Sequence, residues 1–159
     1  MTIIHRAMIV PFSAAQMYDL VNDIESYPEF LHWCSSAKMI FAREDECQAT
    51  MTLSKGGVHK EFTTHNRMQK DKMIELRLIN GPFKQLEGFW RFNVLSQCSC
   101  EILFDLEFEF TNRLVGFALE PIFHPIANTL VDAFCERAEA LYVGSANEEI
   151  RDDRKGGNG

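Results

Sequence analysis

Residues 85 to 142 join two alternating segments to a long apolar helix pattern, and this region constrains the fold most strongly. In both alternating segments, apolar side chains take every second position and mostly polar or charged side chains lie between them. This period of two is typical of antiparallel strands with one buried and one solvated face. The positions expected to be buried are Leu86, Gly88, Trp90, Phe92, Val94, Ile102, Phe104, Leu106, Phe108 and Phe110.

The helix pattern begins near Asn112 and has a natural stop at Gly144. Apolar residues at helical spacing, such as Leu130 and Phe134, predict a helix that covers the aromatic strand face. Two prolines, Pro121 and Pro125, are expected to bend or restart this helix. A curved sheet around a single helix tends to enclose a hollow, so the region predicts a cavity for an apolar ligand.

The preceding residues predict further strands at 3–10, 38–43, 47–54, 59–68 and 73–79. Ser13 is expected to cap a helix over residues 14–22, and Ser26 to cap a short helical turn near residues 27–31. Gly56-Gly57 predicts a hairpin turn, and Asn80-Gly81-Pro82 predicts a strand break. The order predicts an α+β fold with about seven strands, two short helices after the first strand, and a long C-terminal helix.

Length and composition favour one domain. The 159 residues include 46% hydrophobic and 25% charged residues, which is ordinary for a globular protein. We expect the domain to span residues 1–144, and the polar residues 145–159 to be disordered. No apolar run approaches the roughly 20 residues that cross a bilayer, and no secretory signal is visible. We therefore expect the chain to stay in the bacterial cytoplasm.

Motifs for catalysis and metal binding are missing from the sequence. There is no nucleophile elbow, phosphate-cradling glycine loop or helical metal motif. His59 and His65 share a predicted strand face with Glu61, but six residues of strand span roughly 20 Å, too far for one ion. Five cysteines, an odd number, indicate reduced thiols, with Cys98 and Cys100 as packing residues on one strand face. We expect no catalytic residue, no metal and no required cofactor.

The charge is negative overall but uneven along the chain. The net charge is −7, yet eight basic residues face only four acidic residues between Lys55 and Arg91. The overall charge disfavours nonspecific nucleic-acid binding, and no DNA partner is expected. The basic surplus has two interpretations. It forms a solvated sheet exterior with protected edges, or it contacts phosphate on RNA or lipid head groups through Lys60, Arg67 and Lys72.

Three separated segments are specific enough to indicate a family. They are LVNDIESYPEFLHWC at residues 20–34, GPFKQLEGFWRF at residues 81–92, and VDAFCERAEALY at residues 131–142. Together they resemble the coenzyme Q-binding START-domain family of the polyketide cyclase/START-like superfamily. The resemblance covers residues 1 to about 144. His32 departs from the proline that relatives commonly carry before the Trp-Cys pair, which puts the conformation of that loop in question.

The resemblance implies a helix-grip (START-like, Bet v-like) fold and two alternative functions. Members described as ubiquinone-binding proteins imply a non-catalytic protein that binds ubiquinone or a similar polyprenyl lipid, supports respiratory electron transport and contacts the inner membrane peripherally. Bacterial ribosome association toxins imply binding to the large ribosomal subunit, which blocks subunit association. Cyclase or aromatase chemistry rests on superfamily analogy alone.

A lipid tail would gain roughly 0.8 kcal/mol per buried methylene in such a cavity, without a charged anchor. For any single aromatic residue, plain core packing is the alternative interpretation. Residues 27–31 and Trp33 are equally compatible with a lid and with packing on the sheet rim. The expected cavity lining consists of Tyr27, Phe30, Trp33, Met51, Phe62, Leu76, Trp90, Phe92, Phe104, Leu106, Phe108, Phe123, Leu130 and Phe134.

Overall fold

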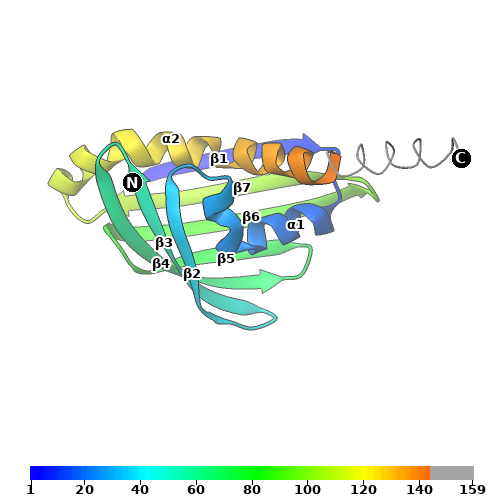
Figure 1. The fold of residues 1–159 in the computed structure, drawn as a ribbon, viewed down its shortest axis with the longest axis horizontal. Helices are drawn as coiled ribbons and strands as arrows, with labels where there is room; N and C mark the ends of the chain where they lie inside the picture. The colour runs from blue at the N-terminus through cyan, green and yellow to red at the C-terminus, as the bar shows by residue number, and fades with distance from the viewer. Residues whose placement is uncertain (144–159) are drawn as a thin grey trace, which may run out of the picture.

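The computed structural model describes residues 1–143 and shows a curved antiparallel sheet around one long helix (Figure 1). The predicted tail at residues 145–159 and the expected helix stop at Gly144 lie outside the described residues. The elements are β1 (Thr2–Val10), α1 (Ala14–Asn22), the 3-10 helix η1 (Ile24–Glu29), β2 (Cys34–Ala42), β3 (Glu46–Lys55), β4 (Val58–Gln69), β5 (Met73–Asn80), β6 (Phe83–Ser96), β7 (Ser99–Phe110), α2 (Arg113–Ala138) and the π-helical turn η2 (Glu139–Val143).

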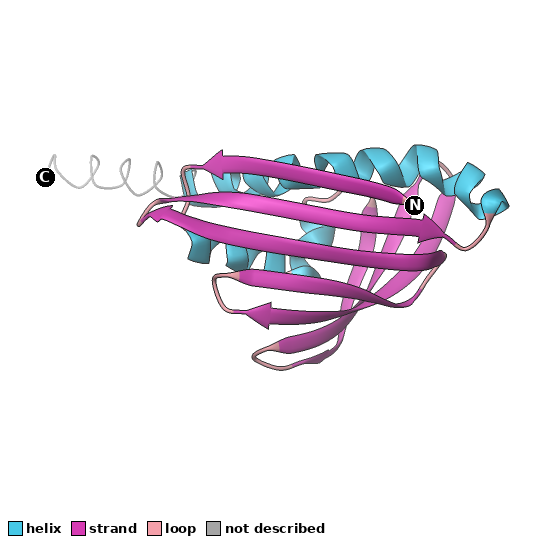
Figure 2. Ribbon diagram, turned by 180° about the vertical axis from the view of Figure 1, so that it is seen from behind, coloured by secondary structure: helices cyan, strands magenta, loops and turns pink. Residues whose placement is uncertain are grey.

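The sheet contains seven strands in the order β1-β7-β6-β5-β4-β3-β2. Every neighbouring pair is antiparallel, and β1 closes the sheet against the last strand, with Ile4 opposite Leu106. The helices lie on the concave side, and the opposite side is the convex outer face (Figure 2). The predicted α+β helix-grip architecture is therefore confirmed.

Helix α2 supplies one wall of the core. Its buried residues recur at helical spacing and face the sheet: Leu119, Phe123, Ile126, Ala127, Val131, Phe134 and Ala138. The segment Arg113–Val143 contains an 18-residue window with a mean hydropathy of 1.3, so by length and composition it could cross a membrane. The same composition is expected of a helix that packs one face against a sheet.

Side-chain caps fix where two helices begin. Ser13 accepts a hydrogen bond from the Gln16 amide, and the Gln16 side chain accepts one from the Ser13 amide, which confirms the expected cap. Asn112 accepts a hydrogen bond from the Val115 amide at 2.9 Å. The cap expected at Ser26 is wrong. Helix η1 already begins at Ile24, so Ser26 lies within it, and the Ser26 hydroxyl donates to Asp23 at the residue before the helix.

Three further expectations are corrected by the structure. Helix α2 runs unbroken through Pro121 and Pro125, so it does not restart there. Val94 is 71% exposed near the end of the β6–β7 hairpin, because alternation marks a strand face but not how far the covering helices extend. Cys98 is exposed in the hairpin turn, whereas Cys100 is fully buried in β7, so the two thiols do not share a strand face.

Candidate functional site

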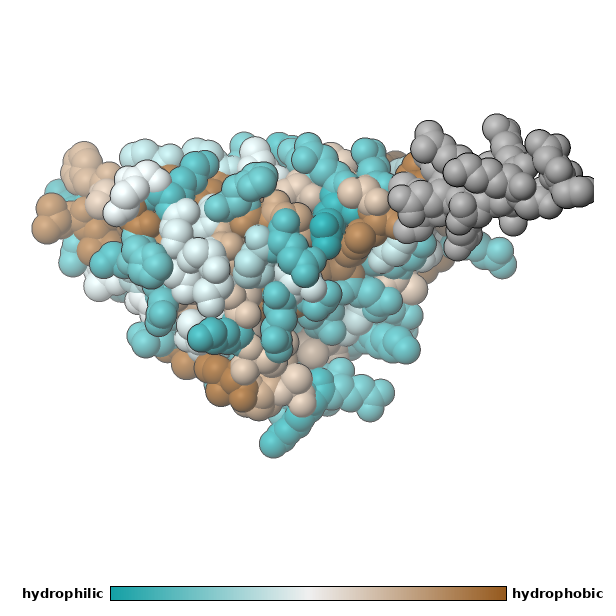
Figure 3. Space-filling view, in the orientation of Figure 1, coloured by the Kyte–Doolittle hydropathy of each residue, from teal (hydrophilic) through white to brown (hydrophobic). Residues whose placement is uncertain are grey.

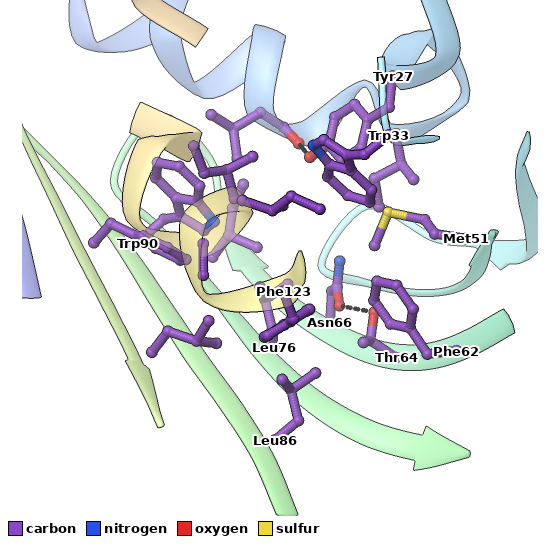
Figure 4. A pocket seen from close by; sticks show the side chains of 18 residues that line it. Tyr27, Trp33, Met51, Phe62, Thr64, Asn66, Leu76, Leu86, Trp90 and Phe123 are labelled. Carbon is purple, nitrogen blue, oxygen red and sulfur yellow. Dashed lines mark hydrogen bonds between the residues drawn. The ribbon is translucent and has the colours of Figure 1, made fainter. Parts of the chain in front are cut away.

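An interior cavity of about 80 Å³ lies between the concave face of the sheet and α2 (Figure 4). Its walls come from α1, η1, the loop before β2, strands β3 to β7, and α2. The lining is almost entirely apolar and consists of Val21, Ile24, Tyr27, Trp33, Met51, Phe62, Thr64, Asn66, Ile74, Leu76, Leu86, Trp90, Phe104, Leu106, Phe123, Ile126, Ala127 and Leu130.

Most of the residues expected at the cavity do line it: Tyr27, Trp33, Met51, Phe62, Leu76, Trp90, Phe104, Leu106, Phe123 and Leu130. Four others lie elsewhere. Phe30 faces a surface groove, and its ring lies 5.4 Å from that of Phe134. Phe92 packs against Tyr18 of α1, with 5.9 Å between ring centroids. Phe108 packs on Phe123 at 4.8 Å. These four aromatic side chains fill space around the cavity.

Two polar residues, Thr64 and Asn66, belong to the lining although sequence reasoning did not nominate them. Both are buried, with 2% of each residue exposed. They lie between Phe62 and Met68 on the inward face of β4, where every second residue is buried. The alternation of inward and outward residues along this strand would therefore have identified them. The other lining residues missed by sequence reasoning are aliphatic: Val21, Ile24, Ile74, Leu86, Ile126 and Ala127.

The two polar side chains interact directly. The Thr64 hydroxyl donates a hydrogen bond to Oδ1 of Asn66 at 2.9 Å. The amide nitrogen of Asn66 points away from Thr64, into the space between the labelled side chains in Figure 4. An amide nitrogen carries two hydrogen-bond donors. The apolar wall therefore presents a donor group at this one strand.

Tyr27 contributes a ring to the cavity, but its hydroxyl is directed elsewhere. The hydroxyl donates to the backbone carbonyl of Val21, so it links η1 to the end of α1. Burial raises the pKa of Tyr27 well above its ordinary value. The side chain is therefore a neutral phenol, and its role at the cavity is to hold η1 in place.

The cavity is smaller than the sequence led us to expect. Its volume of about 80 Å³ is roughly half that of an engineered 150 Å³ cavity that binds benzene. Pockets for drug-sized ligands measure roughly 300–1,000 Å³. A polyprenyl molecule would need more space than this conformation offers inside the protein.

A larger groove of about 640 Å³ lies on the surface beside the cavity. It runs between the end of η1 and α2, and its lining consists of Phe30, Leu31, His32, Trp33, Lys55, Pro125, Ile126, Thr129, Leu130, Ala133, Glu136, Arg137 and Ala140. Trp33, Ile126 and Leu130 line both hollows. These three side chains are therefore the boundary between groove and cavity.

An ion pair holds η1 against α2 at the edge of this groove. Arg137 donates to a carboxylate oxygen of Glu29 at 2.7 Å. The same guanidinium lies over the Phe30 ring, 5.1 Å from its centroid. Both contacts join the short helix to the long one, so they keep the boundary between groove and cavity in its present position.

The expected basic residues do not form one surface. Lys60 and Arg67 lie on β4 about 23 Å apart along the strand, and Lys72 lies in the turn after it. On the outer face, Arg67 stands between Glu46 on β3 and Glu75 on β5. The local surplus of basic residues is thus interleaved with carboxylates.

The histidines make side-chain contacts that do not involve a metal. His59 hydrogen-bonds to Ser54 at 3.0 Å, while His65 contacts Gln48 and Glu46. Within residues 1–143, no group of three or more His, Cys, Asp or Glu side chains is arranged to hold a metal ion.

An exposed apolar stripe occupies the first two turns of α2. Leu114 and Phe117 are 82% and 83% exposed, and Pro121 is also exposed. Their spacing places them on one side of the helix. Figure 3 shows apolar residues gathered at this end of the molecule. We call Leu114, Phe117 and Pro121 the α2 stripe.

Comparisons with known proteins agree with this architecture. Residues 10–135 match the family described as polyketide cyclase / dehydrase and lipid transport. The chain is 43% identical over 141 residues to the Pseudomonas aeruginosa protein named ribosome association toxin RatA, covering 89% of this chain and 98% of that protein. The Xenopus laevis protein named coenzyme Q-binding protein COQ10 homolog B, mitochondrial, is 26% identical over 138 residues, covering 84% of this chain and 57% of that protein.

Solved structures give the same fold. The Zhui aromatase/cyclase from Streptomyces sp. R1128 superposes with a TM-score of 0.77 at 12% identity, covering 87% of this chain and 94% of that one. The protein CC1736 from Caulobacter crescentus gives a TM-score of 0.70 at 27% identity, covering 89% and 99%. The chain therefore belongs to the polyketide cyclase / dehydrase and lipid transport family, alongside the bacterial proteins named ribosome association toxin RatA.

Proposed function

We propose that this protein binds a neutral isoprenoid quinone, such as ubiquinone, and carries it without chemical change. The observation that supports this function is the apolar cavity beneath α2, which lies next to a groove large enough for an alkyl chain. The family description includes lipid transport, and one relative is named for coenzyme Q binding. The cavity of this protein is lined by aromatic and aliphatic side chains, which favour an uncharged ligand.

The sizes of the two hollows define how such a ligand would bind. The cavity of about 80 Å³ would have to enlarge to admit the ring of the head group, and the tail would lie along the groove. Because Trp33, Ile126 and Leu130 separate these spaces, binding requires that these side chains move apart. Ligand uptake would then require the contact between η1 and α2 to open.

Native lipid analysis tests this function. The protein would be purified gently from its own host and its bound lipids identified by mass spectrometry. In a matched variant, Ala127→Leu, the larger side chain would occupy cavity space, because Ala127 lines the cavity. The control is Ala118→Leu, an exposed position on the same helix. We expect quinone with the native protein and the control, and a large loss with Ala127→Leu. Equal lipid content in all three would contradict cavity binding.

A carrier of quinones must meet a membrane, and the α2 stripe supplies an apolar surface for that contact. Arg113 lies beside it and can meet anionic head groups. We expect Phe117→Ser to reduce flotation with vesicles of anionic phospholipid. Leu95→Ser, which alters an exposed apolar residue of the β6–β7 hairpin, is the matched control. An equal loss of flotation in both variants would show that the α2 stripe is not the membrane contact.

A second function, association with a ribosomal subunit, is favoured by the names of the relatives at 43% identity. Sedimentation with separated ribosomal subunits tests this function. The protein is expected to migrate with the large subunit and to reduce the fraction of subunits that associate into whole ribosomes. Because Lys60, Arg67 and Lys72 lie on different parts of the surface, each would be reversed to Glu separately. Co-migration that survives all three reversals would exclude these residues as the contact.

A further inference from the structure

We infer that Asn66 recognises the head of the bound lipid by donating a hydrogen bond from its amide nitrogen to a carbonyl oxygen. The inference rests on the proposed function and narrows its ligand to a molecule that carries a carbonyl group on an apolar frame. Asn66 lines the cavity and is 2% exposed. Its nitrogen points into the cavity (Figure 4).

The surroundings of Asn66 make a purely structural role an incomplete account of this residue. The inward positions of β4 on either side of the polar pair are Phe62 and Met68, both buried and apolar. The amide nitrogen of Asn66 is not a fully buried atom without a partner, a state that costs roughly 1–3 kcal/mol, because it opens onto the cavity. An amide here is explained if its donors meet an acceptor when the cavity is occupied.

Thr64 decides which end of the amide faces the cavity. Its hydroxyl donates to Oδ1 of Asn66 at 2.9 Å and so occupies the acceptor end of the amide. Among the described residues, this is the side-chain hydrogen bond that Asn66 makes, and it leaves the donor end toward the ligand. The site therefore selects a hydrogen-bond acceptor.

One other polar group of the lining, the Tyr27 hydroxyl, does not duplicate this role. The Tyr27 hydroxyl is directed to the carbonyl of Val21. Asn66 stands on β4, across the cavity from α2, whereas the boundary with the groove is formed by Trp33, Ile126 and Leu130. A head group that enters past that boundary would reach Asn66 with its leading edge while its tail stays in the groove. This places the carbonyl at the inner end of the site.

A pair of matched probes tests the inference. 2-Decyl-1,4-benzoquinone and decylbenzene share a flat six-membered ring and a decyl tail, and only the non-aromatic quinone ring carries carbonyl oxygens. The dissociation constant of the quinone would be measured by quenching of tryptophan fluorescence, since Trp33 and Trp90 line the cavity. That of decylbenzene, which does not quench, would be measured by its displacement of the quinone. We expect the native protein to prefer the quinone by roughly fivefold to tenfold, as one net hydrogen bond provides. In Asn66→Leu this preference should fall to about onefold, while decylbenzene binds as before.

Thr64→Val is the second variant, because it frees the amide to rotate while keeping the shape of the side chain. It should reduce the preference partially. Thr52→Val, at a buried threonine of β3 that does not line the cavity, is the matched control and should leave the preference intact. The infrared carbonyl stretching band of the bound quinone gives a direct readout. Its frequency should be lower in the native protein than for the free quinone, and in Asn66→Leu it should return to the frequency of the free quinone.

The outcomes separate this inference from the proposed function. If neither probe binds the native protein, cavity binding itself is wrong. If both probes bind and Asn66→Leu keeps both the preference and the shifted carbonyl band, Asn66 does not recognise the head group. If the carbonyl band in the native protein keeps the frequency of the free quinone, the amide of Asn66 donates to water and not to the quinone. That result would also overturn the inference.

Discussion

At the scale of single residues, Trp90 connects several elements of the core. Its indole stacks on Phe104 with 4.2 Å between ring centroids, and its edge meets Phe134 of α2 at 5.4 Å. It is 2% exposed and also lines the cavity. One side chain therefore joins β6, β7 and the long helix, and stacking geometries of this kind add to the gain from burial.

We expect Trp90→Ala to lower the free energy of unfolding by roughly 3–5 kcal/mol, the usual cost of deleting a large buried aromatic side chain. Phe89→Ala removes a neighbouring aromatic ring from the outer face, where the ring meets Arg91. It should cost only about 1 kcal/mol, as partly exposed contacts do. Denaturant titration measures both. Similar losses in the two variants would show that Trp90 is not the anchor of the core.

Cys100 gives the protein a pH dependence at alkaline pH. It is fully buried, and burial raises the pKa of its thiol from 9.0 to about 11. Below pH 9 the thiol is neutral in both states, and its contribution to stability is fully present. Between pH 9 and 11 the unfolded chain releases this proton first, so the free energy of unfolding falls as the pH rises, by at most about 3 kcal/mol.

Replacing the thiol should weaken this pH dependence. Cys100→Ala is expected to show a shallower loss of stability between pH 9 and 11, the window between the two pKa values. Cys98→Ala, which removes an exposed thiol, should follow the native curve. The measurement is denaturant unfolding at a series of pH values. Parallel curves for the native protein and Cys100→Ala would contradict the assignment.

At the scale of elements, short-range rules explain where most helices and strands lie. Ser13, the Gly56-Gly57 turn and the alternation of β6 and β7 were interpreted correctly, because each depends on neighbouring residues. Val94 and Cys98 were placed wrongly, because the extent of a covering helix is a tertiary property. Cavity size depends on how side chains from many elements interlock, so sequence patterns did not reveal it. The inward position of Asn66 follows from the alternation of β4, but a polar side chain in a strand does not by itself indicate a cavity.

The start of α2 depends on one cap. Asn112 accepts a hydrogen bond from the Val115 amide at 2.9 Å. We expect Asn112→Ala to cost about 1 kcal/mol of stability, as loss of a cap does, whereas Thr111→Ala next to it should change little. Hydrogen exchange would locate the effect in the first turn of α2. Unchanged protection there would show that the cap does not hold this turn.

At the scale of the whole molecule, the contact between η1 and α2 lies beside the boundary between the surface groove and the interior cavity. The Arg137–Glu29 ion pair and the Phe30 ring span this contact. Glu29 is largely exposed, so the pair adds little to overall stability. In the proposed function, opening of this contact joins the groove to the cavity, so the effect of the ion pair should instead appear in the kinetics of ligand exchange.

We therefore expect Arg137→Gln to accelerate dissociation of decylbenzoquinone severalfold while lowering stability by less than about 1 kcal/mol. Raised salt should accelerate dissociation from the native protein and have less effect on the variant. Arg113→Gln, at the opposite end of α2, is the control. Stopped-flow fluorescence of the tryptophans measures the rates. Equal dissociation rates in the native protein and Arg137→Gln would show that this ion pair does not control ligand exchange.

The pairing of β1 with β7 has a consequence for synthesis. Ile4 meets Leu106, a residue about a hundred positions later in the chain. At a translation speed of roughly 5–20 residues per second, the first strand of a nascent polypeptide would wait on the order of 5–20 s for its partner. During that interval its unpaired backbone and apolar face are open to chaperones, and a pause before the codons of β7 would prolong this exposure.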